Sequence, residues 1–424
     1  MTRHSWGLLV LALFTLVSCK DDPDDSARKI RQFFAYDFPT ESFYQVNAVP
    51  LAENDRCIVF ADVEGAVSAD LGERIAGEYQ DNIYPKISGV YGLPLDVDRN
   101  GKLILLLLDI RDGYTEGSGT GYIAGYFYAL DMFDEENSNR ADMLYMDIKP
   151  GIPGDTEFYS TIAHEFQHLI NFSVSYDKRL RNGTIYLMDT WIDEGLSLAA
   201  ESVYLGFPRT DWIRYFNSGR GNIPAGNTFF VWTDDDHVLA EYATAYLFFQ
   251  WLRFGSGGSN AIYRKIIESP YEDYRAVTSA MGKSWEELLR GWFIANAKGW
   301  NALGTTITIH HAPGPSVNLA PGEGVYSWVE TPFSPAPAGN IKQMSTAEPD
   351  SGSPTPPYTL LTFNGNVDNE PDLLEPASIP VTPSSALTQP AAARAARSGV
   401  PARYPVDPHF PGDRTFPADG VLGR

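Results

Sequence analysis

The spacing of apolar side chains separates the chain into a strand-rich first half and a helical second half. Apolar and polar residues alternate over 56–63, which predicts a strand, and apolar residues recur at helical spacing over 70–91. The run Leu103–Leu108 is wholly apolar, which is typical of a strand that is buried on both faces. Two further strands are expected, at 122–130 and 143–148.

Helical spacing dominates from residue 156 to residue 300. Seven of the nine tryptophans lie between Trp191 and Trp300, so we expect a dense aromatic core in this half. Ser284 followed by Glu287 forms a capping box, which predicts that a helix begins there. The whole pattern predicts an α+β fold with an N-terminal strand-rich half and a C-terminal helical half.

The chain changes character after residue 301. Short alternating runs predict a small β module over 301–365. The runs lie at 305–310, 325–329 and 358–363. Seventeen of the thirty prolines lie between Pro332 and Pro417, so the tail at 366–424 is expected to be disordered.

The N-terminus has the pattern of a secretory signal. A stretch of about twelve apolar residues, from Trp6 to Val17, is too short to span a bilayer and ends in a lipobox-like sequence before Cys19. We therefore expect a lipoprotein signal at 1–19, a lipid on Cys19 and a polar tether at 20–41. The alternative is an ordinary signal whose cysteine is incidental. A lipid anchor would hold the protein in the bacterial cell envelope, facing the outside or the periplasm.

Composition and charge narrow the choice of partners. The 424 residues include 54 acidic and 32 basic side chains, and the net charge of −22 argues against nucleic acid or an anionic lipid surface as a partner. With only two cysteines, Cys19 and Cys57, a disulfide-rich scaffold is excluded. Cys57 lies in an apolar run, which predicts a buried thiol. Only seven histidines occur, so a cluster of histidines is informative.

Two of those histidines, His164 and His168, stand four residues apart on either side of Glu165 in the motif HEFQH. In a helix this spacing places both imidazoles on one face, one turn apart, where they can reach one zinc ion. Glu165 projects about a third of a turn away, beside the open position of the ion. The alternative is a surface helix with incidental histidines, and the apolar residues around the motif weigh against it.

A third ligand is expected from the next helix. Thr190 and Asp193 form a near capping box, which predicts that Glu194 lies in the first turn of that helix and faces the histidines. Glu201 follows seven residues later on the same face and would orient His164 or His168. The alternatives are that Glu194 only stabilises the helix dipole and that Glu201 is a solvated charge.

Taken together, HEFQH and the later WIDEGLSLAAE resemble the HExxH-plus-glutamate zinc peptidases, the gluzincins. The second motif is similar to the W-x-N-E-G signature of aminopeptidase N-like enzymes, with Asp193 where asparagine is usual. The upstream LLLLDIRDGY and GYIAGYF look closer to the hyicolysin family of bacterial secreted metallopeptidases. The resemblance covers about residues 100–255. It implies a zincin-like catalytic domain at 42–300 and one zinc per chain, with His164, His168 and Glu194 as ligands and Glu165 as general base.

The mechanism that this resemblance implies needs a donor to the carbonyl oxygen besides the metal. The segment 242–249 resembles the helix that carries the transition-state tyrosine of aminopeptidase N-like enzymes, with Tyr242 at the matching place. Tyr246 and His237 are the competing donors. The exopeptidase motif that holds a free amino group is not evident upstream of HEFQH, so an endopeptidase acting on protein or peptide substrates is preferred to an aminopeptidase. The alternative from another class is a non-catalytic, surface-exposed binding lipoprotein that retains the zincin fold.

A weaker signal precedes the apolar run at 103–108. Asp96, Asp98, Asn100 and Gly101 match the opening of a calcium loop, but position twelve is Leu107, so the closing carboxylate is missing. A turn before the strand is the preferred interpretation, and calcium is possible but not supported by the pattern.

Overall fold

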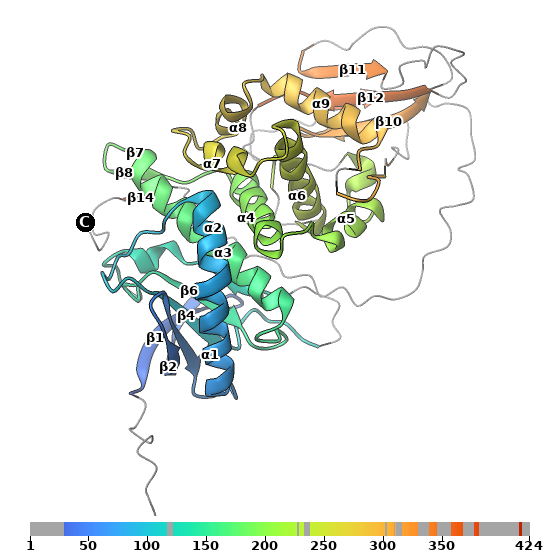
Figure 1. Cartoon of the computed structure of the whole chain (residues 1–424). Helices are drawn as coiled ribbons and strands as arrows, with labels where there is room; N and C mark the ends of the chain where they lie inside the picture. Colours follow the sequence, from blue (N-terminus) through green and yellow to red (C-terminus); the bar gives the residue numbers. More distant parts are fainter. Residues whose placement is uncertain are drawn as a thin grey trace, which may run out of the picture.

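The computed structural model describes residues 29–116, 122–226, 229–232, 238–301, 303–308, 310, 316–329, 339–345, 358–367, 377–380 and 415–417. The main sheet is built from the N-terminal half, and most of the helices follow it in the chain, so the expected α+β class is confirmed (Figure 1). Within the described part of the chain, no helix is both long enough and apolar enough to cross a membrane. Cys19 and the predicted signal lie outside the described residues.

A six-stranded mixed sheet forms the base of the molecule, in the order β1-β2-β3-β4-β6-β5. Its three central strands are parallel, and the outer pairs are antiparallel. The bounds are β1 Arg31–Asp37, β2 Ser42–Glu53, β3 Cys57–Asp62, β4 Leu103–Leu108, β5 Gly125–Tyr126 and β6 Met143–Asp147.

The central strand β4 is buried on both faces, as its sequence predicts, because every residue is at most 3% exposed. Its alternate side chains enter two separate cores. Leu103, Leu105 and Leu107 pack under the helices, and the other three pack with β1 and β2 on the opposite face. The thiol of Cys57, on β3, is buried as expected.

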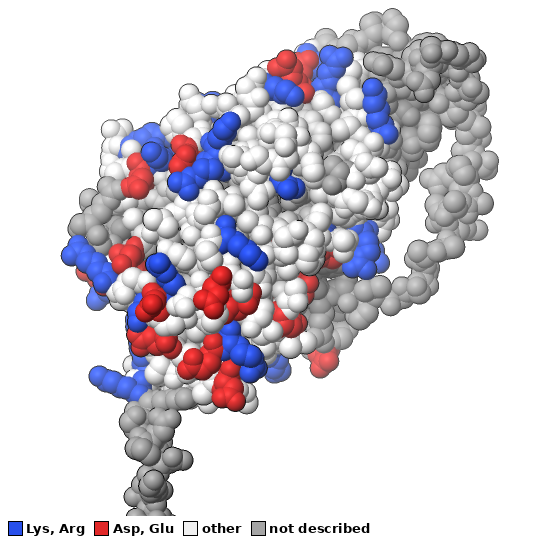
Figure 2. Space-filling model, in the orientation of Figure 1, with Lys and Arg blue, Asp and Glu red and all other residues white. Residues whose placement is uncertain are grey.

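Two long helical segments cover the first of these faces. The first consists of α1 (Ala69–Glu78), a π-helical turn (Tyr79–Ile83) and α2 (Tyr84–Tyr91), which follow one another without a break. The second is α3 (Thr156–Lys178), whose cap Asp155 accepts a hydrogen bond from the backbone N–H of Phe158 at 2.8 Å. On the face shown in Figure 2, acidic side chains gather over the part that carries α1. The part that carries the C-terminal helices is mostly uncharged on this face.

The C-terminal half packs its helices around tryptophans, as the sequence predicts. Trp191 is fully buried and meets the rings of Phe229, Phe248 and Trp285. The predicted capping box at Ser284 is present and opens α9. The helices are α4 (Thr190–Leu205), α5 (Thr210–Asn217), α6 (Val238–Gly255), α7 (Ala261–Ile267), α8 (Tyr274–Met281) and α9 (Trp285–Lys298), with 3-10 turns at Ala129–Met132 and Ile223–Ala225.

Small sheets follow the helices. A three-stranded sheet in the order β10-β12-β11 packs on α9, where the hydroxyl of Tyr326 donates to the carbonyl of Phe293 at 2.6 Å. The expected strand at 305–310 is not formed in the described part of that range. The sheet contains β10 (Gly324–Val329), β11 (Ile341–Ser345) and β12 (Tyr358–Asn364).

Short strands also lie within the range predicted as a disordered tail. β13 (Ala377–Pro380) pairs with β9 (Ser316–Leu319), and β14 (Thr415–Pro417) pairs with β8 (Thr184–Tyr186), whose other neighbour is β7 (Leu180–Arg181). Most of the range 366–424 lies outside the described residues.

The prediction of a strand at 122–130 is mostly wrong. Only the short strand β5 forms in this range, and a 3-10 turn follows it at Ala129–Met132. The carboxylate of Asp131 explains the turn. It accepts hydrogen bonds from the backbone N–H of Asn139 at 2.7 Å and from the hydroxyl of Tyr145 at 2.6 Å, so the chain bends towards β6.

The edge strand β1 lies inside the segment predicted as a tether. Phe33 and Ala35 are each 1% exposed, and the ring of Phe33 meets that of Phe60 at 5.0 Å. Burial alternates along the strand, but Phe34 stands between Phe33 and Ala35, so the sequence does not show the usual alternation of apolar and polar residues. The sheet therefore begins at Arg31.

Candidate metal centre

Helix α3 holds the two histidines of the HEFQH motif one turn apart. The imidazole centroids of His164 and His168 are 4.9 Å from each other, and the residues are 6% and 7% exposed. Around them the helix buries Ile162, Phe166 and Leu169, so the helix backbone is held by the core of the domain. This packing excludes the surface-helix alternative for the motif.

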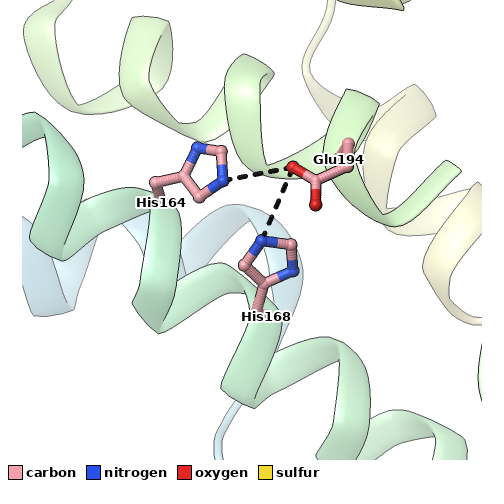
Figure 3. Close-up of side chains that lie close together, drawn as sticks. All are labelled: His164, His168 and Glu194. Carbon is pink, nitrogen blue, oxygen red and sulfur yellow. Dashed lines mark ion pairs between the residues drawn. The ribbon is translucent and has the colours of Figure 1, made fainter. Parts of the chain in front are cut away.

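Glu194 reaches the histidines from α4 (Figure 3). Its Oε2 atom lies 3.4 Å from Nε2 of His164 and 3.8 Å from Nε2 of His168. The predicted capping box is wrong in detail, because Asp189 is the N-cap and Thr190 is already helical. Glu194 therefore lies one residue beyond the first turn.

Close packing of α6 against α4 depends on Gly195, the residue after Glu194. A Cβ atom at this position would lie 2.3 Å from the ring of Phe249, which is closer than van der Waals contact allows. The glycine of the motif WIDEG thus has a packing reason, which is the direct contact of a ring from α6 with the backbone of α4.

The donor set fits a zinc ion. The three ligand atoms of His164, His168 and Glu194 lie within 4.8 Å of one another, and the group could hold a metal ion. Four donors placed tetrahedrally at about 2.0–2.1 Å from zinc are about 3.3 Å apart, which is close to the two measured separations. Two imidazoles and one carboxylate leave a fourth position open, as catalytic zinc sites require.

In both histidines Nδ1, the nitrogen that faces away from Glu194, forms a hydrogen bond with another side chain. Nδ1 of His164 lies 2.8 Å from Oε1 of Glu201. Nδ1 of His168 lies 3.2 Å from Oγ of Ser197 and 3.1 Å from Oδ2 of Asp193. Because Ser197 donates its one hydroxyl proton to Gln167, its oxygen is an acceptor for His168. Both imidazoles therefore carry their proton on Nδ1 and present the Nε2 lone pair to the group.

A buried arginine holds Glu201. Arg209 is 6% exposed, and its guanidinium contacts the carboxylates of Glu201, Glu157 and Asp211, the last two at 2.7 and 2.6 Å. Burial alone would lower the pKa of Arg209, but the three carboxylates outweigh that effect and raise it. A permanent positive charge therefore stands behind Glu201, on the side away from His164.

Four residues are predicted to act on the substrate, and the structure describes three of them. Glu165 is 2% exposed and lies on α3 beside His164. Tyr242 is buried, with its ring stacked on Trp212 at 5.8 Å and edge-on to Trp232 at 4.9 Å. The hydroxyl of Tyr246 accepts the backbone N–H of Arg209 at 2.8 Å and also bonds Ser202. His237 lies outside the described residues.

Comparison with known proteins agrees with this geometry. The chain is 34% identical over 232 residues to the neutral metalloprotease ShpI of Staphylococcus hyicus, an alignment that covers 53% of this chain and 51% of that protein. Over this half of its length, the chain is similar to a metalloprotease. Its His/His/Glu group fits the zincin type that the sequence motifs predict. The chain spans about half the length of this curated relative, and no family model matches it.

Sequence reasoning missed three residues that support the group of His164, His168 and Glu194. Asp193 and Ser197 flank Glu194 on α4 and bond His168, and Arg209 fixes Glu201. In the sequence Asp193 stands out as a departure from asparagine, but a carboxylate next to Glu194 can also accept a histidine N–H. Ser197 lies one helical turn after Asp193, and that spacing is the signal that finds it. For Arg209 the local sequence gives no signal.

An acidic group lies just before the strands β4 and β6. The turn predicted at 96–101 is present, and the carboxylate of Asp96 accepts the N–H groups of Asn100 and Gly101, each at 3.0 Å. Oxygens of Asp96, Asp98 and the buried Asp142 lie within 4.8 Å of one another. Burial, followed by repulsion from Asp98, raises the pKa of Asp142 to about 7.

Replacing Asp142 by asparagine is expected to remove a loss of stability at high pH. The pKa of Asp142 is about 7 in the folded state and about 3.9 when unfolded. Its contribution to stability is therefore fully present below pH 4 and is lost as the pH rises through 7. In calcium-free buffer the variant should be about 4 kcal/mol more stable than the wild type at pH 8, and nearly equal at pH 4.

Urea unfolding at both pH values measures this difference. Asparagine keeps an oxygen for the N–H of Val97, which donates to Asp142 at 3.2 Å, so the turn should be retained. An equal loss of stability in both proteins between pH 4 and 8 would show that Asp142 is not responsible.

Proposed function

We propose that this protein is a zinc endopeptidase that hydrolyses peptide bonds in protein substrates. The observation that carries the proposal is the buried group of His164, His168 and Glu194, with Glu165 next to the first histidine. Homology to a neutral metalloprotease over half the chain supports the same reaction class.

The residues have distinct roles in the proposed reaction. His164, His168 and Glu194 would hold zinc, which when bound supplies a Lewis acid that lowers the pKa of water to about 7. Glu165 takes one proton from the attacking water, whose oxygen bonds to the carbonyl carbon. Tyr242 donates a hydrogen bond to the oxygen that becomes negative. As the C–N bond breaks, the proton on Glu165 passes to the leaving amine nitrogen.

We also propose a location in the bacterial cell envelope, with a lipid on Cys19, and a catalytic domain that begins with β1 at Arg31, and so before the expected residue 42, and extends to residue 300. The proposal rests on the signal-like sequence at 1–19. Because β1 begins at Arg31, a tether would be limited to the residues between Cys19 and this strand.

Zinc content and cleavage specificity test the proposed function together. The purified chain should contain about one zinc ion, and it should cleave an unfolded protein and the same peptide with an acetylated or a free N-terminus at similar rates. Removing zinc with a chelator should abolish cleavage, and adding zinc back should restore it. Cleavage of free N-termini alone would make the protein an aminopeptidase. If the purified chain neither contains zinc nor cleaves these substrates, the alternative of a binding lipoprotein would be supported.

A further inference from the structure

A cavity of about 390 Å³ lies against α4, on the side of this helix that faces away from Glu194 and the two histidines. Its walls come from the C-terminal end of α4, the second half of α6 and the beginning of α7, which adjoin one another in Figure 1. Val203 lines it and follows Glu201 by two positions, which is about 200° around the helix. The cavity is therefore separate from the contact between Glu201 and His164.

The polar lining carries charge of one sign. Arg253 is the charged residue among those that line the cavity, and the remaining polar lining consists of Ser202, Gln250, Asn260 and Tyr263. The Nε atom of Arg253 is buried and has no hydrogen-bond partner in the described part of the chain. In a chain of net charge −22, a buried guanidinium N–H that no carboxylate takes up is unusual.

Tyr263 offers a second donor that is also unused. The residue is 0% exposed, and its hydroxyl has no hydrogen-bond partner among the described residues. Its ring stacks on Tyr91 with the centroids 5.9 Å apart and the planes within 5° of parallel, which fixes the direction of the hydroxyl. Burial raises the pKa of Tyr263, so its hydroxyl stays protonated and can donate at neutral pH.

We propose that this cavity binds a small organic carboxylate. Arg253 pairs with the carboxylate, and Tyr263 donates a hydrogen bond to the same group. The apolar walls, which include Val203 and Phe254, take the hydrocarbon part of the ligand. A single cation matches one negative charge, whereas a phosphate dianion would be left under-compensated. The volume lies in the range of about 300–1,000 Å³ that is typical of small-molecule sites.

Calorimetric titration of the purified full chain tests this site with N-acetyl-leucine, its neutral amide and inorganic phosphate as probes. The acid should bind at one site, and the amide at least about tenfold more weakly. Arg253→Gln should weaken binding of the acid by about tenfold or more, and Tyr263→Phe by about threefold or more. Arg264→Gln is the matched control, because this half-buried arginine on α7 pairs with Glu268 instead.

Each result decides for or against the cavity. Binding of the acid that survives both Arg253→Gln and Tyr263→Phe would place it elsewhere, including on a zinc ion at His164, and would overturn the proposal. Equal binding of acid and amide, or binding of phosphate alone, would overturn the choice of a carboxylate. Tyr263→Phe removes one oxygen atom and keeps the stacked ring, so it decides the question even if Arg253→Gln is unstable. None of these readouts depends on peptidase activity.

Discussion

Replacing Glu165 by glutamine is expected to leave about one zinc ion bound to each chain and to lower kcat by about a thousandfold. Glutamine has nearly the same shape as glutamate but cannot accept the proton of the attacking water. The histidines and Glu194 are unchanged, so the affinity for zinc should stay within about twofold. Zinc analysis of the purified variant and the rate of cleavage of an unfolded protein measure the two quantities.

The control for this variant is Glu73→Gln, which removes an exposed carboxylate on α1, far along the chain from the motif. It should change neither zinc content nor kcat. If Glu165→Gln cleaves as fast as the wild type, Glu165 is not the general base. If the wild type and Glu165→Gln both bind zinc and are equally inert on a broad peptide library, the chain is a binding protein that retains the zincin fold.

Replacing Glu201 by glutamine is expected to weaken zinc binding by about 10- to 100-fold. In the wild type, Glu201 accepts the Nδ1 proton of His164 at 2.8 Å, and Arg209 contacts its other oxygen. This carboxylate therefore holds His164 in the tautomer that presents Nε2 to the metal, and its charge increases the basicity of the imidazole. A neutral amide keeps the shape but loses the charge. Competition with a chromogenic zinc chelator gives the Kd directly.

Glu157→Gln is the matched control for Glu201→Gln. Glu157 also contacts Arg209, at 2.7 Å, but its side chain is 63% exposed and the contact lies away from His164. The affinity of this variant for zinc should remain within about twofold of the wild type. Equal weakening by both substitutions would mean that the charge on Arg209, and not the bond from Glu201 to His164, sets the affinity.

The local features of the fold were predictable, and the long-range ones were not. The spacing of His164 and His168 is a property of one helix, and the apolar run of β4 is complete within six residues. The contact between Glu201 and His164 joins residues 37 positions apart, so it depends on how α3 packs against α4. The face that Glu201 shares with Glu194 predicts that it orients one of the two histidines, but not that this histidine is His164.

Two failures have clear physical causes. Arg209 follows the end of α4 and contacts Asp211 and Glu201, which are near in sequence, and also Glu157, which is 52 positions away, so no local window of sequence contains the whole pattern. The strand expected at 122–130 ends early because Asp131 bonds to Asn139 and Tyr145, and these bonds outweigh the strand propensity of the aromatic residues before it. In both cases tertiary hydrogen bonds override the local preference.

The contact between Gly195 and Phe249 restricts how the proposed active site can move. The ring of Phe249 on α6 packs directly on the backbone of α4. The helix that carries Glu194 and the helix that carries Tyr242 are therefore in direct contact at this point. Close-packed interfaces of this kind resist sliding, so the two helices should travel as one rigid body. Any opening that admits a polypeptide must then come from displacement of that body relative to the sheet, and the separation of Glu194 from Tyr242 stays constant throughout.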